Sequence, residues 1–150
     1  FMRSQKYKIN CSFASSFKIK YGMIQYLKKY PLTWLTIAII LYLSFFKPPQ
    51  TDMEEIPGID KLAHICMYGG LCFILWIEYL RTHSAIHWKR IIIGGILFPV
   101  AFSGCIELAQ SYLTEHRGGD WLDLMANTTG VLLAALVGYY ILRPIIWKKR

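Results

Sequence analysis

Four apolar stretches separated by short polar connections dominate the pattern of this chain. They cover residues 32–46, 62–80, 91–113 and 122–142. The last three are long enough to cross a bilayer as α-helices, whereas the first has 15 residues and falls a little short of a hydrocarbon core of ~30 Å. This layout predicts an all-α, polytopic membrane protein whose four transmembrane helices form one bundle.

Prolines and glycines mark where these helices end or deform. The connection that holds Pro48, Pro49, Pro57 and Gly58 cannot be one continuous helix. Pro99 lies inside the third stretch and predicts a bend there.

A second pattern of small residues lies in the fourth stretch, where Gly130, Ala134 and Gly138 recur every four residues. Such a ridge lets a neighbouring helix approach closely, so we interpret these three residues as helix-packing positions.

The charges are distributed in blocks, and the blocks predict the orientation. Only 17% of the residues are charged, against about a quarter in soluble domains. Fourteen of the seventeen basic residues fall in residues 1–29, 81–90 and 143–150, which hold no acid; residues 47–61 and 114–121 hold three basic and six acidic residues. The positive-inside rule therefore places both termini and the middle connection in the cytoplasm. Because the basic residues flank apolar stretches, a nucleic-acid partner is not expected.

The same pattern divides the chain into three parts. Residues 1–29 form a basic cytoplasmic tail, residues 30–143 a four-helix transmembrane domain, and residues 144–150 a basic cytoplasmic end. Residues 1–22 are interpreted as a disordered basic tail; the alternative is an extension that is not native, because Met23 followed by IQYLKKYP is a more natural start. The four cysteines show no CxxC spacing, so neither a disulfide framework nor a cysteine zinc site is expected.

With this orientation, polar side chains from three helices gather near the outer surface. They are Asp60, Lys61, His64 and Tyr68 at the start of the second helix, Glu107 and Gln110 near the end of the third, Arg117 in the loop, and Asp123 and Asn127 at the start of the fourth. Helical spacing places the members of each set on one face. Three such stripes at one depth predict a single polar pocket that opens outward.

Glu107 carries the strongest signal, because a carboxylate inside a transmembrane helix costs roughly 2.5–3.5 kcal/mol unless it is protonated, paired or hydrated. Arg117, Lys61, His64 and Tyr68 are candidate partners. A structural hydrogen-bond clasp between helices is the alternative interpretation.

Simpler interpretations also exist for the acids at the helix starts. Asp120, Asp123 and Asp60 can cap or begin helices and suit the helix dipole. Asn127 lies beyond the first turn, where capping does not explain it. Carboxylates and an imidazole also suit divalent ions, so a metal site is a further alternative for Asp60, His64, Glu107 and Asp123. No spacing is diagnostic of one, and we assign neither a metal nor a cofactor.

The ordered set of motifs resembles the VanZ-like family of small bacterial membrane proteins. The matching pieces, within residues 32–142, are Asp60-Lys61-x-x-His64 with Tyr68, Glu107-x-x-Gln110, and Arg117 followed by Asp123-x-x-x-Asn127-x-x-Gly130. The resemblance implies a bacterial cytoplasmic membrane protein, and the family's namesake is associated with reduced susceptibility to teicoplanin. It supplies no biochemical reaction.

Together these observations predict recognition or modification of a cell-envelope component at the outer leaflet. Glu107, His64 and Asp123 are the candidate catalytic residues, and the candidate ligand-binding residues are Asp60, Lys61, Tyr68, Gln110, Arg117 and Asn127. Expected partners are membrane lipids and an envelope precursor or glycopeptide-related ligand; the oligomeric state stays open. The alternatives are a non-catalytic assembly or binding module, or a small transporter, which would place its site nearer the membrane midplane.

Overall fold

The computed structural model describes residues 25–46, 58–113 and 120–149. The chain divides into two units, Phe1–Pro31 and Leu32–Arg150. In the first unit, residues 25–29 are helical. The described residues of the second unit are helices joined by short connections and contain no strand, so the all-α prediction is confirmed for them. The predicted site residue Arg117 and residues 1–24 lie outside the described residues.

Three long helices and one short helix make up the second unit. The short one is α2, Pro31–Phe45, and the first long helix is α3, Ile59–Thr82. The next runs through α4, Trp88–Ile92, the π-helical segment η2, Ile93–Leu97, and α5, Phe98–Leu113. The last runs through α6, Trp121–Val137, the π-helical segment η3, Gly138–Leu142, and α7, Arg143–Lys148. The three long helices have the length and apolar composition that crossing a membrane requires, whereas α2 has 15 residues.

Both π-helical segments lie just before a proline. η2 precedes Pro99, and η3 precedes Pro144. A proline lacks the N–H of the regular helix ladder, and its ring crowds the carbonyl four residues earlier. A π-helical turn is a local change in the helical hydrogen-bond pattern of the kind that accommodates this. The irregularity predicted near Pro99 therefore takes the form of a π-helical turn, and a second one occurs near Pro144.

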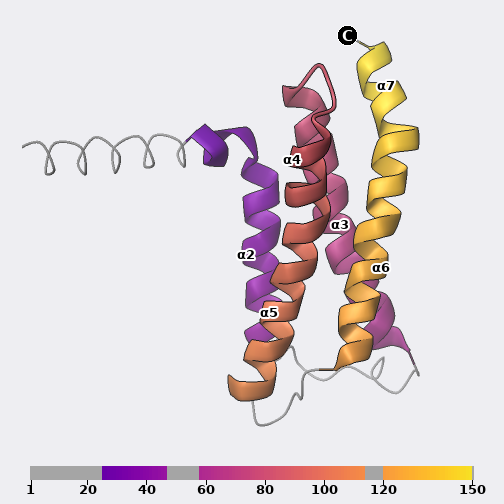
Figure 1. Cartoon of the computed structure of the whole chain (residues 1–150). Helices are drawn as coiled ribbons and strands as arrows, with labels where there is room; N and C mark the ends of the chain where they lie inside the picture. The colour runs from indigo at the N-terminus through magenta and orange to yellow at the C-terminus, as the bar shows by residue number, and fades with distance from the viewer. Residues whose placement is uncertain (1–24, 47–57, 114–119, 150) are drawn as a thin grey trace, which may run out of the picture. The chain divides into compact units, whose positions relative to one another are not determined.

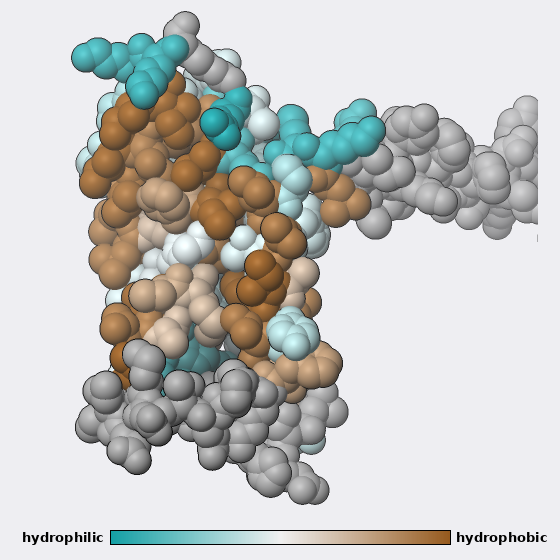
Figure 2. Space-filling view, turned by 180° about the vertical axis from the view of Figure 1, so that it is seen from behind, coloured by the Kyte–Doolittle hydropathy of each residue, from teal (hydrophilic) through white to brown (hydrophobic). Residues whose placement is uncertain are grey.

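The long helices run side by side, with the start of α3, the end of α5 and the start of α6 at one end of the second unit (Figure 1). Buried residues of α2, α3, α5 and α6 form one apolar core: Ile37, Ile40, Tyr68, Leu71, Cys72, Ile106, Val131 and Ala134. Hydrophobic side chains also cover most of the flank that Figure 2 shows. An apolar core inside an apolar surface fits a bundle that lies in lipid.

Glycines set the distance between α3 and α6. A Cβ atom on Gly130 would lie 2.4 Å from the Ile65 carbonyl oxygen and 2.9 Å from the Gly69 nitrogen. A Cβ on Gly138 would lie 2.3 Å from the Trp76 ring. The small-residue ridge of the fourth stretch therefore packs against a helix of the same chain. Gly130 contacts the backbone of α3, and Gly138 contacts the indole ring of Trp76.

A buried carboxylate on α3 caps the start of α2. Glu78 is 6% exposed, and its Oε1 accepts a hydrogen bond from the Leu32 N–H at 2.9 Å. Its Oε2 accepts from the Thr33 N–H at 3.1 Å and from the Thr33 hydroxyl at 2.6 Å. The first amides of a helix have no partner within it, so a carboxylate at this point satisfies them and favours the helix dipole. The sequence indicated no partner for Glu78.

We expect Glu78→Ala to release the first turn of α2. The amides of Leu32 and Thr33 lose their acceptor in a buried place, at a cost of about 1–3 kcal/mol. Hydrogen–deuterium exchange of the purified protein should then show faster exchange at these two amides, about tenfold or more. Thr33→Val removes only the hydroxyl bond and should give a much smaller change; equal exchange in all three proteins would contradict the cap.

Candidate functional site

A lysine on α3 joins the carboxylates at the start of α6. The Lys61 ammonium lies 2.9 Å from an oxygen of Asp120 and donates a short hydrogen bond to Oδ1 of Asp123. It also lies 3.6 Å from Oδ2 of Asp60 on its own helix. Three carboxylates against one ammonium leave this cluster with a formal charge of −2. The excess of acid means that the Lys61 charge is already matched inside the protein.

The acids at the helix starts have different local roles. Asp120 is the N-cap of α6, where its side chain accepts a hydrogen bond from the Leu122 N–H at 2.9 Å. Lys61 and this N–H hold the pKa of Asp120 below its ordinary value. Asp60 lies in the first turn of α3, but the N-cap is Gly58, in the left-handed region with φ 85°. Capping therefore explains Asp120 and does not explain Asp60.

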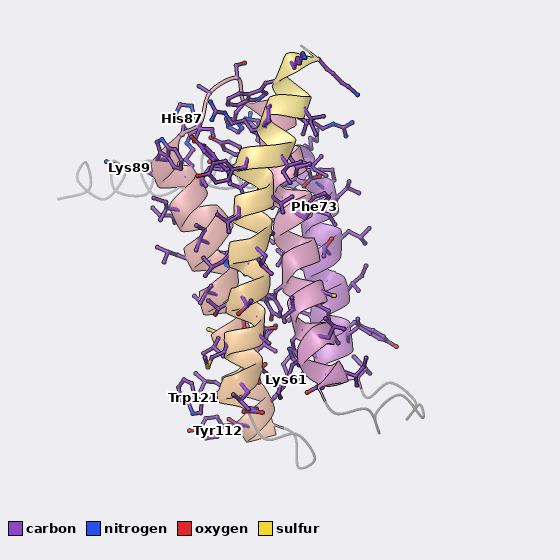
Figure 3. All side chains as sticks on the ribbon, turned by 90° about the vertical axis from the view of Figure 1, so that its right-hand side faces the viewer. Lys61, Phe73, His87, Lys89, Tyr112 and Trp121 are labelled. Carbon is purple, nitrogen blue, oxygen red and sulfur yellow. The ribbon has the colours of Figure 1, made fainter. Side chains whose placement is uncertain are left out.

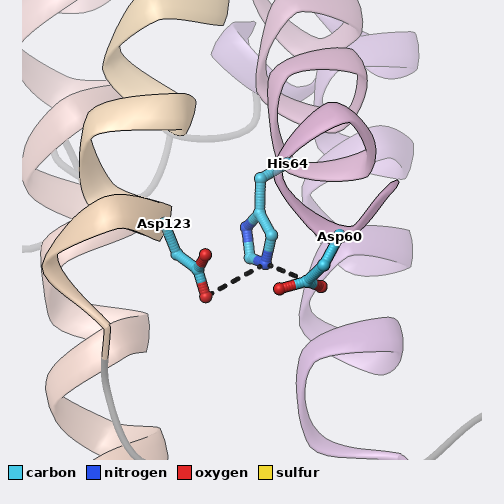
Figure 4. A group of neighbouring side chains, drawn as sticks. All are labelled: Asp60, His64 and Asp123. Carbon is cyan, nitrogen blue, oxygen red and sulfur yellow. Dashed lines mark ion pairs between the residues drawn. The ribbon is translucent and has the colours of Figure 1, made fainter. Parts of the chain in front are cut away.

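His64 lies between two of these carboxylates. Its Nε2 is 3.7 Å from Oδ1 of Asp60 and 3.6 Å from Oδ2 of Asp123 (Figure 4). The His64 side chain is 8% exposed, and Nε2 has no hydrogen-bond partner among the described residues. The Asp60 side chain is half exposed, so the group opens to the outside at Asp60.

The other nitrogen of His64 is held by a buried chain of hydrogen bonds. Nδ1 lies 3.0 Å from Oδ1 of Asn127, and the Asn127 amide group donates to Oγ of Ser103 at 2.7 Å. Asn127 and Ser103 are both 0% exposed. This chain joins α3, α6 and α5 at one level. Helical spacing in the sequence places Ser103 on the same face of the third helix as Glu107 and Gln110, but Ser103 was not among the predicted site residues.

The remaining predicted site residues lie on the α5 side of this chain. Tyr68 is 2% exposed, interacts with Ser103 and lies near the Glu107 carboxylate. Glu107 is 8% exposed, so it does not face lipid. Gln110 is 4% exposed and donates to the Ser44 carbonyl of α2 at 2.8 Å. The structure thus brings residues of the three polar stripes together, with His64, Asp123 and Asn127 on one side and Tyr68 and Glu107 on the other, whereas the hydrogen bond of Gln110 goes to α2.

Aromatic side chains surround the end of the unit that holds this set. Tyr112 and Trp121 are 85% and 80% exposed and lie at the same end as Lys61, whereas His87 and Lys89 lie at the other end (Figure 3). Exposed Trp and Tyr are enriched where membrane proteins meet the headgroup region. Their position fits a polar set at the depth of the lipid headgroups.

An open apolar groove lies beside the polar set, between α3 and α6. Its volume is about 260 Å³, and its lining includes Ile65, Gly69 and Gly70 of α3 and Gly130 and Leu133 of α6. Lys61 lies four residues before Ile65, so it belongs to the α3 face that lines the groove. The charged cluster therefore lies at one end of the apolar groove.

Comparison with known proteins finds one family. The family model described as VanZ/LLP1 matches residues 3–143. No curated protein and no solved structure matches the chain.

Proposed function

The chain belongs to the VanZ/LLP1 family, as its motifs predicted, and from this premise we propose that it recognises or modifies a lipid-linked, anionic envelope component. The site is the outward-facing polar set around His64, Glu107 and Asn127. The observation that carries the proposal is the open apolar groove beside the polar set. The cluster around Lys61 has a formal charge of −2, so the positive charge for an anionic head comes from Arg117. A ligand with a polar head and a long apolar tail has the chemistry that matches both parts.

In this proposal the protein lies in the bacterial cytoplasmic membrane with four spans and both termini inside. The distribution of basic residues supports that orientation. In addition to the three long helices, α2 also crosses the membrane. At 1.5 Å per residue its 15 residues reach about 22 Å, so the bilayer thins locally or flanking residues complete the crossing. Glu78 supports this arrangement, because it fixes the start of α2 beside α3 near the cytoplasmic end.

Glu107 and Arg117 divide the chemistry between them. Arg117 belongs to the outer loop and supplies charge-assisted hydrogen bonds to a phosphate-type head. Glu107 orients the head or transfers a proton, since a desolvated carboxyl can serve as acid or base. His64 and Asp123 complete the reacting group if the ligand is modified, and an effect on teicoplanin susceptibility would follow from a changed envelope component.

Binding of a prenyl diphosphate to the purified protein in nanodiscs tests the proposal. Farnesyl diphosphate should bind the wild type, and Glu107→Gln and Arg117→Ala should each weaken binding about tenfold or more. Arg117→Ala removes the charge-assisted hydrogen bonds to the diphosphate, and Glu107→Gln removes the carboxyl proposed to orient the head. Lys47→Ala, a basic residue of the other outer connection, is the matched control and should bind as the wild type does. Unchanged binding in both site variants would contradict the assigned roles.

The groove has its own test in Gly70→Leu. A Cβ on Gly70 meets no atom within 4 Å, so the leucine fills the groove without disturbing the helix contact. We expect farnesyl diphosphate to bind about tenfold more weakly, while inorganic pyrophosphate, which has no tail, keeps its wild-type affinity. Gly94→Leu, at another glycine with nothing within 4 Å, is the control. An unchanged affinity for farnesyl diphosphate in Gly70→Leu would remove the groove from the proposal.

The groove also favours a second candidate, a non-catalytic assembly module that docks a helix of another protein. Gly70 lines the groove and has no described atom within 4 Å of an added Cβ, so it offers the small surface that membrane helices use for close packing. Sensitivity of Gly130 or Gly138 cannot separate the candidates, because both residues pack against α3 of the same chain. Gly70→Leu does separate them. If the protein is an assembly module, Gly70→Leu abolishes crosslinking to the partner helix, and the wild-type protein does not bind farnesyl diphosphate.

A further inference from the structure

The starting observation is the unpartnered nitrogen of a buried histidine. His64 Nε2 points between one oxygen of Asp60 and one oxygen of Asp123, and the three ligand atoms of this group lie within 4.8 Å of one another. The distances from Nε2 to the carboxylates, 3.7 and 3.6 Å, exceed hydrogen-bond length. The buried Nε2 therefore has no hydrogen-bond partner in the part of the chain that the structure describes, and a cation or a proton between it and the two carboxylates would supply one.

The hydrogen-bond chain through Asn127 determines what Nε2 can offer. Asn127 donates through its amide nitrogen to Ser103, so its oxygen faces His64 and accepts. His64 Nδ1 must then carry the proton, which leaves the lone pair of the neutral imidazole on Nε2. Metal-binding histidines are typically fixed this way, with one nitrogen donating to an oxygen and the other facing the metal.

We propose that Asp60, His64 and Asp123 bind a divalent transition-metal ion. Neighbouring ligand atoms around a zinc ion lie about 3.4 Å apart, given bond lengths near 2.1 Å and tetrahedral angles. The two Nε2–carboxylate separations are only slightly longer, and all three ligand atoms lie within 4.8 Å of one another, so rotations of the two aspartate side chains would close the site. Imidazole together with carboxylate suits Zn²⁺ or Mn²⁺ better than Mg²⁺. Three protein ligands leave a position open for a water or an anion.

Lys61 supports this assignment rather than competing for the same atoms. The ammonium pairs with Oδ1 of Asp123 and Oδ2 of Asp60, whereas Nε2 faces the opposite oxygen of each carboxylate. Lys61 therefore orients both carboxylates toward His64. With Asp120 included, the cluster carries a formal charge of −2, which one divalent ion neutralises.

The metal site stands without the proposed function, but one consequence rests on it. An ion at this place would bind the anionic head directly, which accounts for anion recognition in a cluster where acids outnumber the single lysine. Diphosphate binding that persists after chelation would overturn this consequence only. Metal binding without any diphosphate binding would overturn the proposed function and leave the metal site in place.

The test is titration of the full-length protein, purified in detergent and stripped by a chelator, with Zn²⁺ alone. Cys11, Cys66 and Cys105 are first replaced by serine, so that their thiols do not bind the ion. We expect one Zn²⁺ per chain, with Asp60→Asn and Asp123→Asn about 100-fold weaker. Asn127→Ala, which acts on the metal only through His64, should weaken binding about 10- to 100-fold. Co²⁺ in place of Zn²⁺ should give a visible spectrum that these variants lose.

Asp120→Asn is the matched control, because it removes an equal charge beside Lys61 without removing a ligand. Its Zn²⁺ affinity should stay within about threefold of the parent. Asp60 is half exposed, so Asp60→Asn is expected to fold even where a change at His64 does not. Absence of stoichiometric binding in the parent, or equal losses in Asp60→Asn and Asp120→Asn, would overturn the site.

Discussion

Gly130→Ala is expected to separate α3 from α6 and to destabilise the bundle by about 3 kcal/mol or more. The new Cβ would lie 2.4 Å from the Ile65 carbonyl oxygen and 2.9 Å from the Gly69 nitrogen. Both atoms belong to backbone inside a helix, so no side-chain rotation relieves the contact. The helices must move apart, and the buried contacts along this seam weaken together. Thermal or SDS-induced unfolding in detergent measures the loss.

Gly70→Ala is the control for that experiment. It adds the same methyl group to the neighbouring helix at a place where nothing lies within 4 Å. Removing a glycine from a helix interior there should be neutral or stabilise by roughly 0.5–1 kcal/mol. A Gly130→Ala protein as stable as Gly70→Ala would show that the two helices do not meet at this glycine.

The helices of this protein were predictable from its sequence, and so was the family to which the chain belongs. Long apolar stretches bounded by Pro57, Gly58 and charged connections leave few alternatives to membrane helices. The predicted limits differ from those of α3 by two or three residues at each end. The four-residue spacing of Gly130, Ala134 and Gly138 also indicated correctly that a helix approaches there, because that property is local to one helix face.

Pairings between helices were not predictable in the same way. Which residue meets His64 depends on how α3 and α6 are rotated and shifted, and packing at Gly130 fixes both. The sequence therefore placed Asn127 in the site without identifying its two partners. It also offered Lys61 as a partner for Glu107, whereas the structure pairs Lys61 with Asp120 and Asp123.

Glu78 shows a second limit. The sequence analysis assigned Glu78 no role, and its partner is the first turn of α2, more than forty residues away. Every helix begins with amides that have no partner within the helix. The amides that follow Pro31 therefore do not identify the side chain that caps them. Contacts of this kind become visible only when the helices are placed in space.

Asn127→Ala is expected to have the second large effect, a loss of about 2–4 kcal/mol in the free energy of unfolding. The change leaves a cavity and removes the partners of His64 Nδ1 and Ser103 Oγ in a fully buried place. Thr128→Ala is the matched control, because the Thr128 hydroxyl bonds only the Leu124 carbonyl of its own helix.

A double-mutant cycle separates the hydrogen bond from the cavity. Ser103→Ala should cost less once Asn127 is already alanine, with a coupling of about 1 kcal/mol, within the range of interhelical hydrogen bonds in membranes. A second cycle, with His64→Leu in place of Ser103→Ala, measures the hydrogen bond between His64 and Asn127. Since Asn127 connects α3 to α5 through α6, additive effects in both cycles would mean that the three helices are held at this level by packing alone.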